Sequence, residues 1–175
     1  NQKDKQKSTI TNNITLNNNT DNKKQETEEE FISEKKENLS RKRTITERKN
    51  FIKILFIDDD TKFQVVKILM KSGWVHTKII KDAETLEMQE ITNAHLIFVD
   101  IQKVGISMGF NDEGLGLSLA LKEKYPSKKI IIYSAETNGN RFHQALQKAD
   151  FSLEKNADPY QFQKLVEDLS EGYLE

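Results

Sequence analysis

The sequence of 175 residues contains no cysteine, only two prolines and no long apolar run. The absence of cysteine excludes disulfides and thiol chemistry, and it suits a reducing compartment. No stretch reaches the roughly 18–20 apolar residues that span a bilayer, and the N-terminus lacks the apolar core of a signal peptide. We therefore expect a cytoplasmic protein with no membrane segment.

The first 50 residues are poor in apolar side chains and rich in asparagine and charge. They hold 12 Lys/Arg and 9 Asp/Glu, a net charge of +3, whereas the remainder holds 15 and 19, a net charge of −4. Such a segment buries too little apolar area to offset its ordering entropy. We predict a disordered or partly helical tail over residues 1–50 and a folded domain over residues 51–175. The basic cluster at 41–43 is best interpreted as solvated, so we do not expect nucleic-acid binding.

From Phe51 onward, short apolar runs alternate with helical patterns. The runs predict strands near 52–57, 75–80, 95–99, 129–133 and 150–153. Apolar spacing predicts helices at 61–72, 114–124 and 138–148, a weaker one at 82–91, and a last one after Asp158. Asp158 stands where an N-cap belongs, followed by Pro159 at the first helical position. This alternation predicts an α/β fold with a doubly wound, five-stranded parallel sheet.

Polar side chains stand at the ends of four of these strands. They are Asp58 and Asp59 after the first run, Asp100 after the third, Ser134 after the fourth and Lys155 after the fifth. Because parallel strands end at one edge of a sheet, we expect these groups to meet there. Carboxylates are ligands for Mg²⁺, and an aspartate can attack phosphorus to give an acyl phosphate. A lysine and a hydroxyl could then stabilise the phosphoryl oxygens.

These landmarks resemble the receiver domain of two-component response regulators over about residues 51–172. The matching segments are ILFIDDD, LIFVD, GLGLSLALKEKYP, IIIYSAE and LEKNADP. The resemblance implies strand order 2-1-3-4-5, five flanking helices, dependence on Mg²⁺, and phosphoryl transfer from a sensor histidine kinase or a phosphotransfer protein. It also implies a downstream protein partner, a possible homodimer, and a signalling role rather than that of an enzyme.

The resemblance also implies a role for each polar residue. Asp58 and Asp59 look like the acidic pair that holds the metal, and Asp100 looks like the phospho-acceptor and a third metal ligand. The backbone carbonyl of Gln102 would be a further ligand. By position, Ser134 resembles the switch hydroxyl and Lys155 the phosphate-binding lysine.

Three features depart from the receiver pattern. The usual lysine–proline pair is here Lys155-Asn156, and a cis bond before Asn costs roughly 3 kcal/mol, which favours a different lysine loop. Ser152 stands where receivers place a switch aromatic, with Phe151 one step earlier on the opposite strand face. The loop 101–113 is about six residues longer than usual, apolar and glycine-containing. It is interpreted as a lid, a partner contact or a tolerated insertion.

Two other functions are compatible with these residues. The first is a pseudo-receiver, a constitutive protein-interaction module that never carries phosphate; Ser152 and Asn156 motivate it. The second is a small phosphohydrolase of the haloacid-dehalogenase type, whose Asp-x-Asp motif Asp58 and Asp60 would supply. Lys62 stands where that motif has Thr or Val, and only the hydrolase would use Asp58 as its nucleophile.

Overall fold

The computed structural model describes residues 43–135 and 144–173. Their strands are β1 (Ile54–Ile57), β2 (Thr77–Ile80), β3 (Leu96–Asp100), β4 (Lys129–Ser134) and β5 (Phe151–Glu154). All neighbouring strands are parallel, in the order β2-β1-β3-β4-β5. The five predicted strands and the strand order implied by the resemblance are therefore confirmed.

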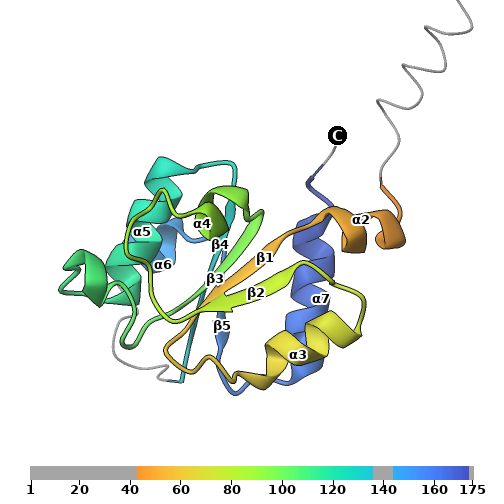
Figure 1. Ribbon diagram of the computed structural model, residues 1–175, viewed down its shortest axis with the longest axis horizontal. Coiled ribbons are helices and arrows are strands. Elements are labelled where there is room, and N and C mark those ends of the chain that lie inside the picture. The colour runs from red at the N-terminus through yellow and green to blue at the C-terminus, as the bar shows by residue number, and fades with distance from the viewer. Residues whose placement is uncertain (1–42, 136–143, 174–175) are drawn as a thin grey trace, which may run out of the picture. The chain divides into compact units, whose positions relative to one another are not determined.

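Helices cover both faces of the sheet (Figure 1). On one side lie α3 (Gln64–Lys71) and α7 (Pro159–Ser170), and on the other α4 (Gln89–Asn93), α5 (Gly114–Lys124) and α6 (Gln144–Lys148). Strands that are covered on both faces must be apolar at every position, because successive side chains point to opposite sides. The central strands β1 and β3 are buried along their whole length, as this arrangement requires.

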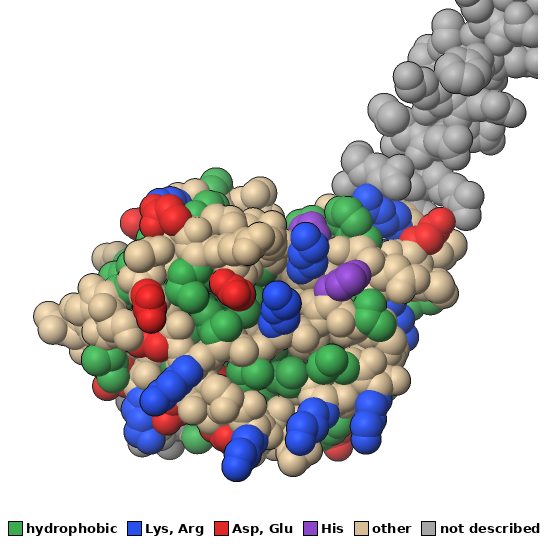
Figure 2. All heavy atoms as spheres, in the orientation of Figure 1, with side chains coloured by type: hydrophobic (Ala, Val, Ile, Leu, Met, Phe, Trp, Pro, Cys, Tyr) green, Lys and Arg blue, Asp and Glu red, His purple; other side chains and the backbone are tan. Residues whose placement is uncertain are grey.

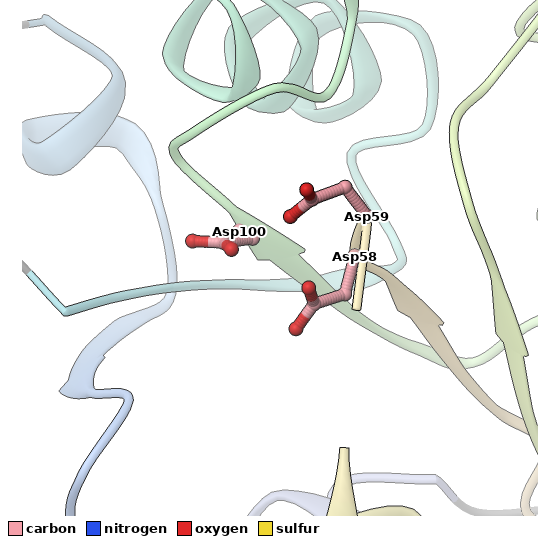
Figure 3. Close-up of side chains that lie close together, drawn as sticks. All are labelled: Asp58, Asp59 and Asp100. Carbon is pink, nitrogen blue, oxygen red and sulfur yellow. The ribbon is translucent and has the colours of Figure 1, made fainter. Parts of the chain in front are cut away.

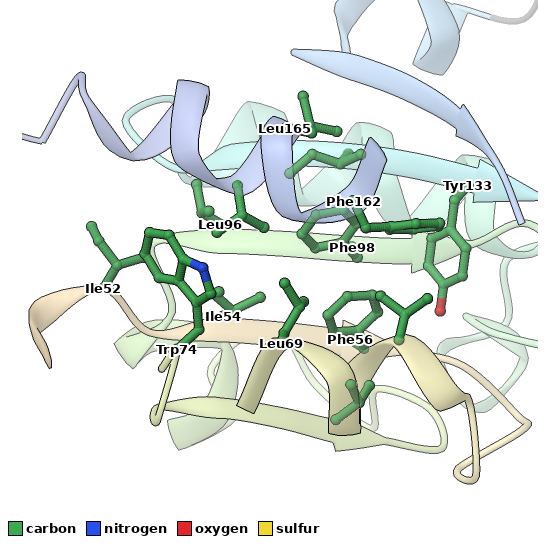
Figure 4. Packing of buried hydrophobic residues seen from close by; sticks show 14 residues of the cluster. Ile52, Ile54, Phe56, Leu69, Trp74, Leu96, Phe98, Tyr133, Phe162 and Leu165 are labelled. Atoms are coloured by element: carbon green, nitrogen blue, oxygen red, sulfur yellow. The ribbon is translucent and has the colours of Figure 1, made fainter. Parts of the chain in front are cut away.

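The face beneath α3 and α7 carries an aromatic core (Figure 4). Phe56 and Phe98 stack with ring centroids 4.4 Å apart, and Phe162 of α7 packs against both Phe98 and Tyr133. The opposite face is aliphatic and includes Leu55, Ile97, Leu117 and Leu121. The sheet thus separates two different cores, and its carboxyl edge lies between them.

Two helices differ from the prediction. The weak pattern at 82–91 yields only the five residues of α4, and a further helix, α2 (Ile45–Phe51), lies across the predicted boundary at residue 50. A capping box between Thr44 and Glu47 begins α2. Its Arg48 donates hydrogen bonds of 2.8 Å to the carbonyl of Glu167 and the hydroxyl of Ser170. The described residues therefore hold six α-helices and a short 3₁₀ helix, where five helices were expected. Of the tail predicted over residues 1–50, residues 1–42 lie outside the described residues, and most of the remainder forms α2.

The edge strand β2 is short and carries a lysine, Lys78, facing solvent. A short edge strand that carries a lysine is a poor template for strand pairing with another chain. Figure 2 shows basic side chains spread over the face that contains this edge. Across residues 43–135 and 144–173, no helix has both the length and the apolar character needed to cross a lipid bilayer.

Candidate metal and phosphate site

Three carboxylates meet at the carboxyl edge of the sheet, as the sequence predicted (Figure 3). Asp58 and Asp59 directly follow β1, and Asp100 ends the neighbouring strand β3. One oxygen atom from each residue lies within 4.8 Å of the others. Asp58 and Asp100 are buried, and Asp59 is partly exposed. Carboxylate oxygens gathered at this spacing suit a hard divalent cation such as Mg²⁺, with Asp59 on the side that faces solvent.

Lys155 joins two of these carboxylates. Its Nζ atom lies 2.9 Å from Oδ1 of Asp58 and 2.6 Å from Oδ2 of Asp100. Burial lowers the pKa of Lys155, but its contacts with the two carboxylates outweigh burial and raise the pKa above its usual value. Lys155 therefore carries its positive charge at neutral pH, within reach of any group bound to Asp100.

The loop that carries Lys155 reaches the site without a cis bond. The described residues contain no cis peptide bond, so the Lys155–Asn156 bond is trans. The backbone N–H of Lys155 donates to the carbonyl of Ser134 at 2.8 Å, which extends the β4–β5 pairing by one residue. The replacement of proline by Asn156 therefore leaves the ammonium group in contact with Asp100.

Asp100 lies in surroundings that disfavour its ionised form. Burial raises the pKa of Asp100, and the nearby charge of Asp58 raises it further. The contact with Lys155 and the backbone N–H of Gln102 lower the pKa but do not cancel the rise. The three carboxylates outnumber the two ammonium groups that contact them, those of Lys155 and Lys103, and this favours the arrival of a cation.

Tyr133 is a member of the site that the sequence analysis missed. Its hydroxyl donates a 2.6 Å hydrogen bond to Oδ2 of Asp58, and both side chains are fully buried. Burial and the adjacent Asp58 carboxylate raise the pKa of Tyr133 far above its usual value, so the phenol remains a donor. A signal was available: a buried tyrosine at a strand end needs a partner for its hydroxyl, and β4 ends at the edge that gathers the carboxylates.

Ser134 ends β4 and is buried at the same edge of the sheet. It is one residue beyond Tyr133, which is paired in register with Asp100. The structure therefore brings Ser134 to the edge where the carboxylates lie. Neither the predicted role of Ser134 as the switch hydroxyl nor the predicted metal contact of the Gln102 carbonyl is tested by this geometry.

The long loop 101–113 packs onto the domain instead of overhanging the site as a free lid. Val104 is fully buried in the aliphatic core. The carboxylate of Asp82 accepts hydrogen bonds from the backbone N–H groups of Gly105 (2.5 Å) and Ser107 (3.0 Å). The loop also contributes a positive charge to the site, because Nζ of Lys103 lies 3.2 Å from Oδ2 of Asp59. An exposed apolar residue, Ile106, remains on its surface.

Ser152 occupies the position at which receivers usually carry the switch aromatic, as the sequence indicated. Ser152 is exposed on β5, and the Phe151 side chain is 47% exposed. An aromatic residue does bond to the site, but it is Tyr133 on β4, through its hydroxyl.

Comparison with known proteins points to one fold. No protein-family model matches the chain, and a search of the curated proteins finds no match. Among solved structures, the receiver domain of NtrX from Brucella abortus matches with 24% identity and a TM-score of 0.56, over 69% of this chain and 99% of that one. A longer NtrX structure matches with a TM-score of 0.57, and there the match covers only 27% of that chain.

Two further structures extend the comparison. A CheY-like receiver domain protein from Methanospirillum hungatei has 22% identity and a TM-score of 0.54, over 69% of this chain and 95% of that one. A response regulator from Burkholderia pseudomallei, with a phosphorylated aspartic acid and a calcium ion, has 21% identity and a TM-score of 0.51, over 68% of each chain. The described domain therefore has the fold of response-regulator receiver domains, as the resemblance in its sequence predicted.

Proposed function

We propose that this protein is a phospho-accepting receiver in which Mg²⁺-dependent transfer of a phosphoryl group to Asp100 switches a protein-interaction surface. The observation that carries the proposal is the double contact of Lys155 with Asp58 and Asp100, beside Asp59. A nucleophilic carboxylate, further acidic groups and an ammonium group thus lie together at one edge of the sheet. The donor would be a phosphohistidine of a sensor histidine kinase or a phosphotransfer protein.

The transfer is a displacement at phosphorus. A carboxylate oxygen of Asp100 forms a bond to phosphorus while the bond between phosphorus and the donor's histidine nitrogen breaks, and a proton restores the neutral histidine. Mg²⁺, held by Asp58, Asp59 and Asp100 with the Gln102 carbonyl, would neutralise charge on the phosphoryl oxygens. Lys155 supplies a second positive charge, and its ammonium group also contacts Asp58.

The switch follows from the change at Asp100. Phosphorylation converts a carboxylate that pairs with Lys155 into a bulkier group with more acceptor oxygens. The hydroxyl of Ser134, at the end of the adjacent strand, would donate to one of these oxygens and draw β4 toward the site. A downstream protein that binds the shifted surface better would then be recruited, because a ligand stabilises the state it prefers.

Intact-protein mass spectrometry tests this function. We expect the full chain to gain one phosphoryl group after incubation with acetyl phosphate and Mg²⁺, and to gain none in excess EDTA. Asp100→Asn should abolish the gain, whereas Asp168→Asn, which alters an exposed carboxylate on α7, should leave it intact. A folded protein that binds Mg²⁺ but gains no mass would favour the pseudo-receiver. Loss of the gain in Asp58→Asn, together with its persistence in Asp100→Asn, would instead favour the hydrolase.

A further inference from the structure

Tyr133 belongs to the core and to the site at once. Its ring is fully buried, with its centroid 5.5 Å from that of Phe63 and 6.2 Å from that of Phe162. Figure 4 shows the ring at the end of the aromatic cluster, with its oxygen directed away from the α7 side chains. Contacts on several sides hold the phenol ring in place, so its hydroxyl occupies a fixed position at the carboxyl edge of the sheet.

The hydroxyl fixes one half of the Asp58 carboxylate. Oδ2 of Asp58 accepts from Tyr133 at 2.6 Å, while Oδ1 accepts from the Asp60 N–H at 2.8 Å and from Lys155 at 2.9 Å. The other two donors belong to a loop and to a long side chain. Tyr133 is the donor that a packed core holds rigidly, and it therefore sets the plane in which the carboxylate lies.

We propose that Tyr133 is a positioning residue of the metal site, which acts on the ion through Asp58. The inference rests on the proposed function, because it presumes that Asp58, Asp59 and Asp100 hold Mg²⁺. Hydrogen bonds to a metal-binding carboxylate orient it before the metal arrives, and removal of such outer partners typically weakens metal binding by about 10–100-fold. A tyrosine that only fills the core would contribute to stability and leave Mg²⁺ affinity unchanged.

The chain contains a matched control at the opposite edge of the sheet. The hydroxyl of Tyr173 donates a 2.6 Å hydrogen bond to the carbonyl of His95, which precedes β3, whereas Asp100 ends that strand. Tyr133→Phe and Tyr173→Phe therefore each remove one hydroxyl and a hydrogen bond of 2.6 Å. Tyr173→Phe also removes two longer bonds, to the carbonyl of Ser127 (3.3 Å) and from the N–H of Lys129 (3.2 Å). Only the bond of Tyr133 touches a proposed metal ligand.

Calorimetric titration of the full-length variants with MgCl₂ tests the proposal. We expect Tyr133→Phe to weaken Mg²⁺ binding about tenfold, and Tyr173→Phe to bind Mg²⁺ as the parent does. Equal affinity in the parent and Tyr133→Phe would overturn the inference while leaving the proposed function standing. A parent protein that binds no Mg²⁺ would overturn both.

A double-mutant cycle shows whether Tyr133 acts through Asp58. In an Asp58→Asn background the phenol no longer faces a carboxylate, so the further change to Phe should alter Mg²⁺ affinity by much less than tenfold. A tenfold effect that persists in that background would contradict action through Asp58.

A measurement on the unaltered fold covers the case in which Tyr133→Phe does not fold. The chain has four tyrosines, which 3-fluorotyrosine labels together. Three separate variants, Tyr125→Phe, Tyr160→Phe and Tyr173→Phe, assign the remaining fluorine signal to Tyr133. We expect the Tyr133 signal to shift during the Mg²⁺ titration, with the midpoint found by calorimetry. A Tyr133 signal that ignores saturating Mg²⁺ would overturn the proposal.

Discussion

Nζ of Lys155 lies 2.6 Å from Oδ2 of Asp100, across the carboxyl edge of the sheet. The same atom also contacts the fully buried Asp58. One ammonium group thus offsets two carboxylates in the absence of any metal, and its removal would leave two buried like charges close together.

The first prediction concerns this ammonium group. Lys155→Met should lower the free energy of unfolding by about 3 kcal/mol in EDTA, because a buried charge loses its partner. Mg²⁺ should restore part of the loss, since a dication neutralises the same carboxylates. Urea unfolding with and without Mg²⁺ measures both effects.

An exposed lysine serves as the control for that experiment. Lys164 pairs with Asp168 on the surface of α7, where such pairs contribute roughly 0–1 kcal/mol. Lys164→Met should therefore change stability little, and Mg²⁺ should not alter the difference. Similar losses in the two variants would contradict the buried pairing of Lys155.

The second prediction concerns Lys103, whose ammonium group lies against Asp59. Its backbone has a φ of 57°, and its N–H donates at 2.5 Å to the Glu113 carboxylate, so the loop holds the residue near the site. Lys103→Met should tighten Mg²⁺ binding a few-fold, because a competing cation is removed. A surface pair of this kind is worth roughly 0–1 kcal/mol, which bounds the gain at about fivefold. Lys71→Met, at the end of α3, removes the same charge elsewhere and should leave the affinity unchanged.

The third prediction concerns Gly114, which begins α5 directly beside Asp100. A Cβ at this position would lie 2.8 Å from the backbone carbonyl carbon of Asp100, and closer still to the carbonyl oxygen. Gly114→Ala should therefore displace β3 or α5, with a loss of about 3 kcal/mol in stability and weaker Mg²⁺ binding. In Gly172→Ala the nearest atom is 3.8 Å away, so thermal unfolding should differ little from that of the parent. Similar melting temperatures in the two variants would show that the approach at Gly114 is not tight.

The fourth prediction concerns pH and Asp82, which anchors the long loop. Burial raises the pKa of Asp82, but hydrogen bonds from the N–H groups of Ser107 and Gly105 outweigh burial and hold the pKa below its usual 3.8. A lowered pKa means that the carboxylate stabilises the fold above pH 3.8 and loses this effect as pH falls through the folded-state pKa.

Asp82→Asn tests that dependence. We expect it to be about 1–3 kcal/mol less stable than the parent at pH 7, because backbone donors lose a charged acceptor. The difference should begin to shrink below pH 3.8 and should disappear as pH falls through the lowered pKa of folded Asp82, where the parent becomes protonated too. Denaturant unfolding from pH 7 to pH 3 gives the profile, and a difference independent of pH would argue against an ionised anchor.

Much of the fold could be predicted because the sheet is buried on both faces. Runs such as Ile54–Ile57 and Leu96–Val99 are apolar at every position, which few structures other than a covered parallel strand require. The strand-end residues followed from topology, since parallel strands that are neighbours must end together. It was therefore possible to predict from the sequence that Asp58, Asp100 and Lys155 lie at the same edge of the sheet.

What could not be predicted depends on partners far apart in the sequence. The helix α2 lies in a polar stretch, and Arg48 docks it on α7, 119 residues away from its acceptor Glu167. The hydrogen bond of Tyr133 to Asp58 spans 75 residues and requires the register of three strands. The docking of the loop 101–113 could not be predicted either, because its glycines and apolar residues carry no local signal of the anchor at Asp82.

The decisive test of Asp100 as the phospho-acceptor is the position of the phosphoryl group after reaction with acetyl phosphate and Mg²⁺. Reduction with borohydride converts a phosphorylated aspartate into homoserine, which peptide mass spectrometry then locates. We expect homoserine at position 100, and at neither 58 nor 59. Homoserine at position 58, or at no position in a protein that binds Mg²⁺, would contradict it.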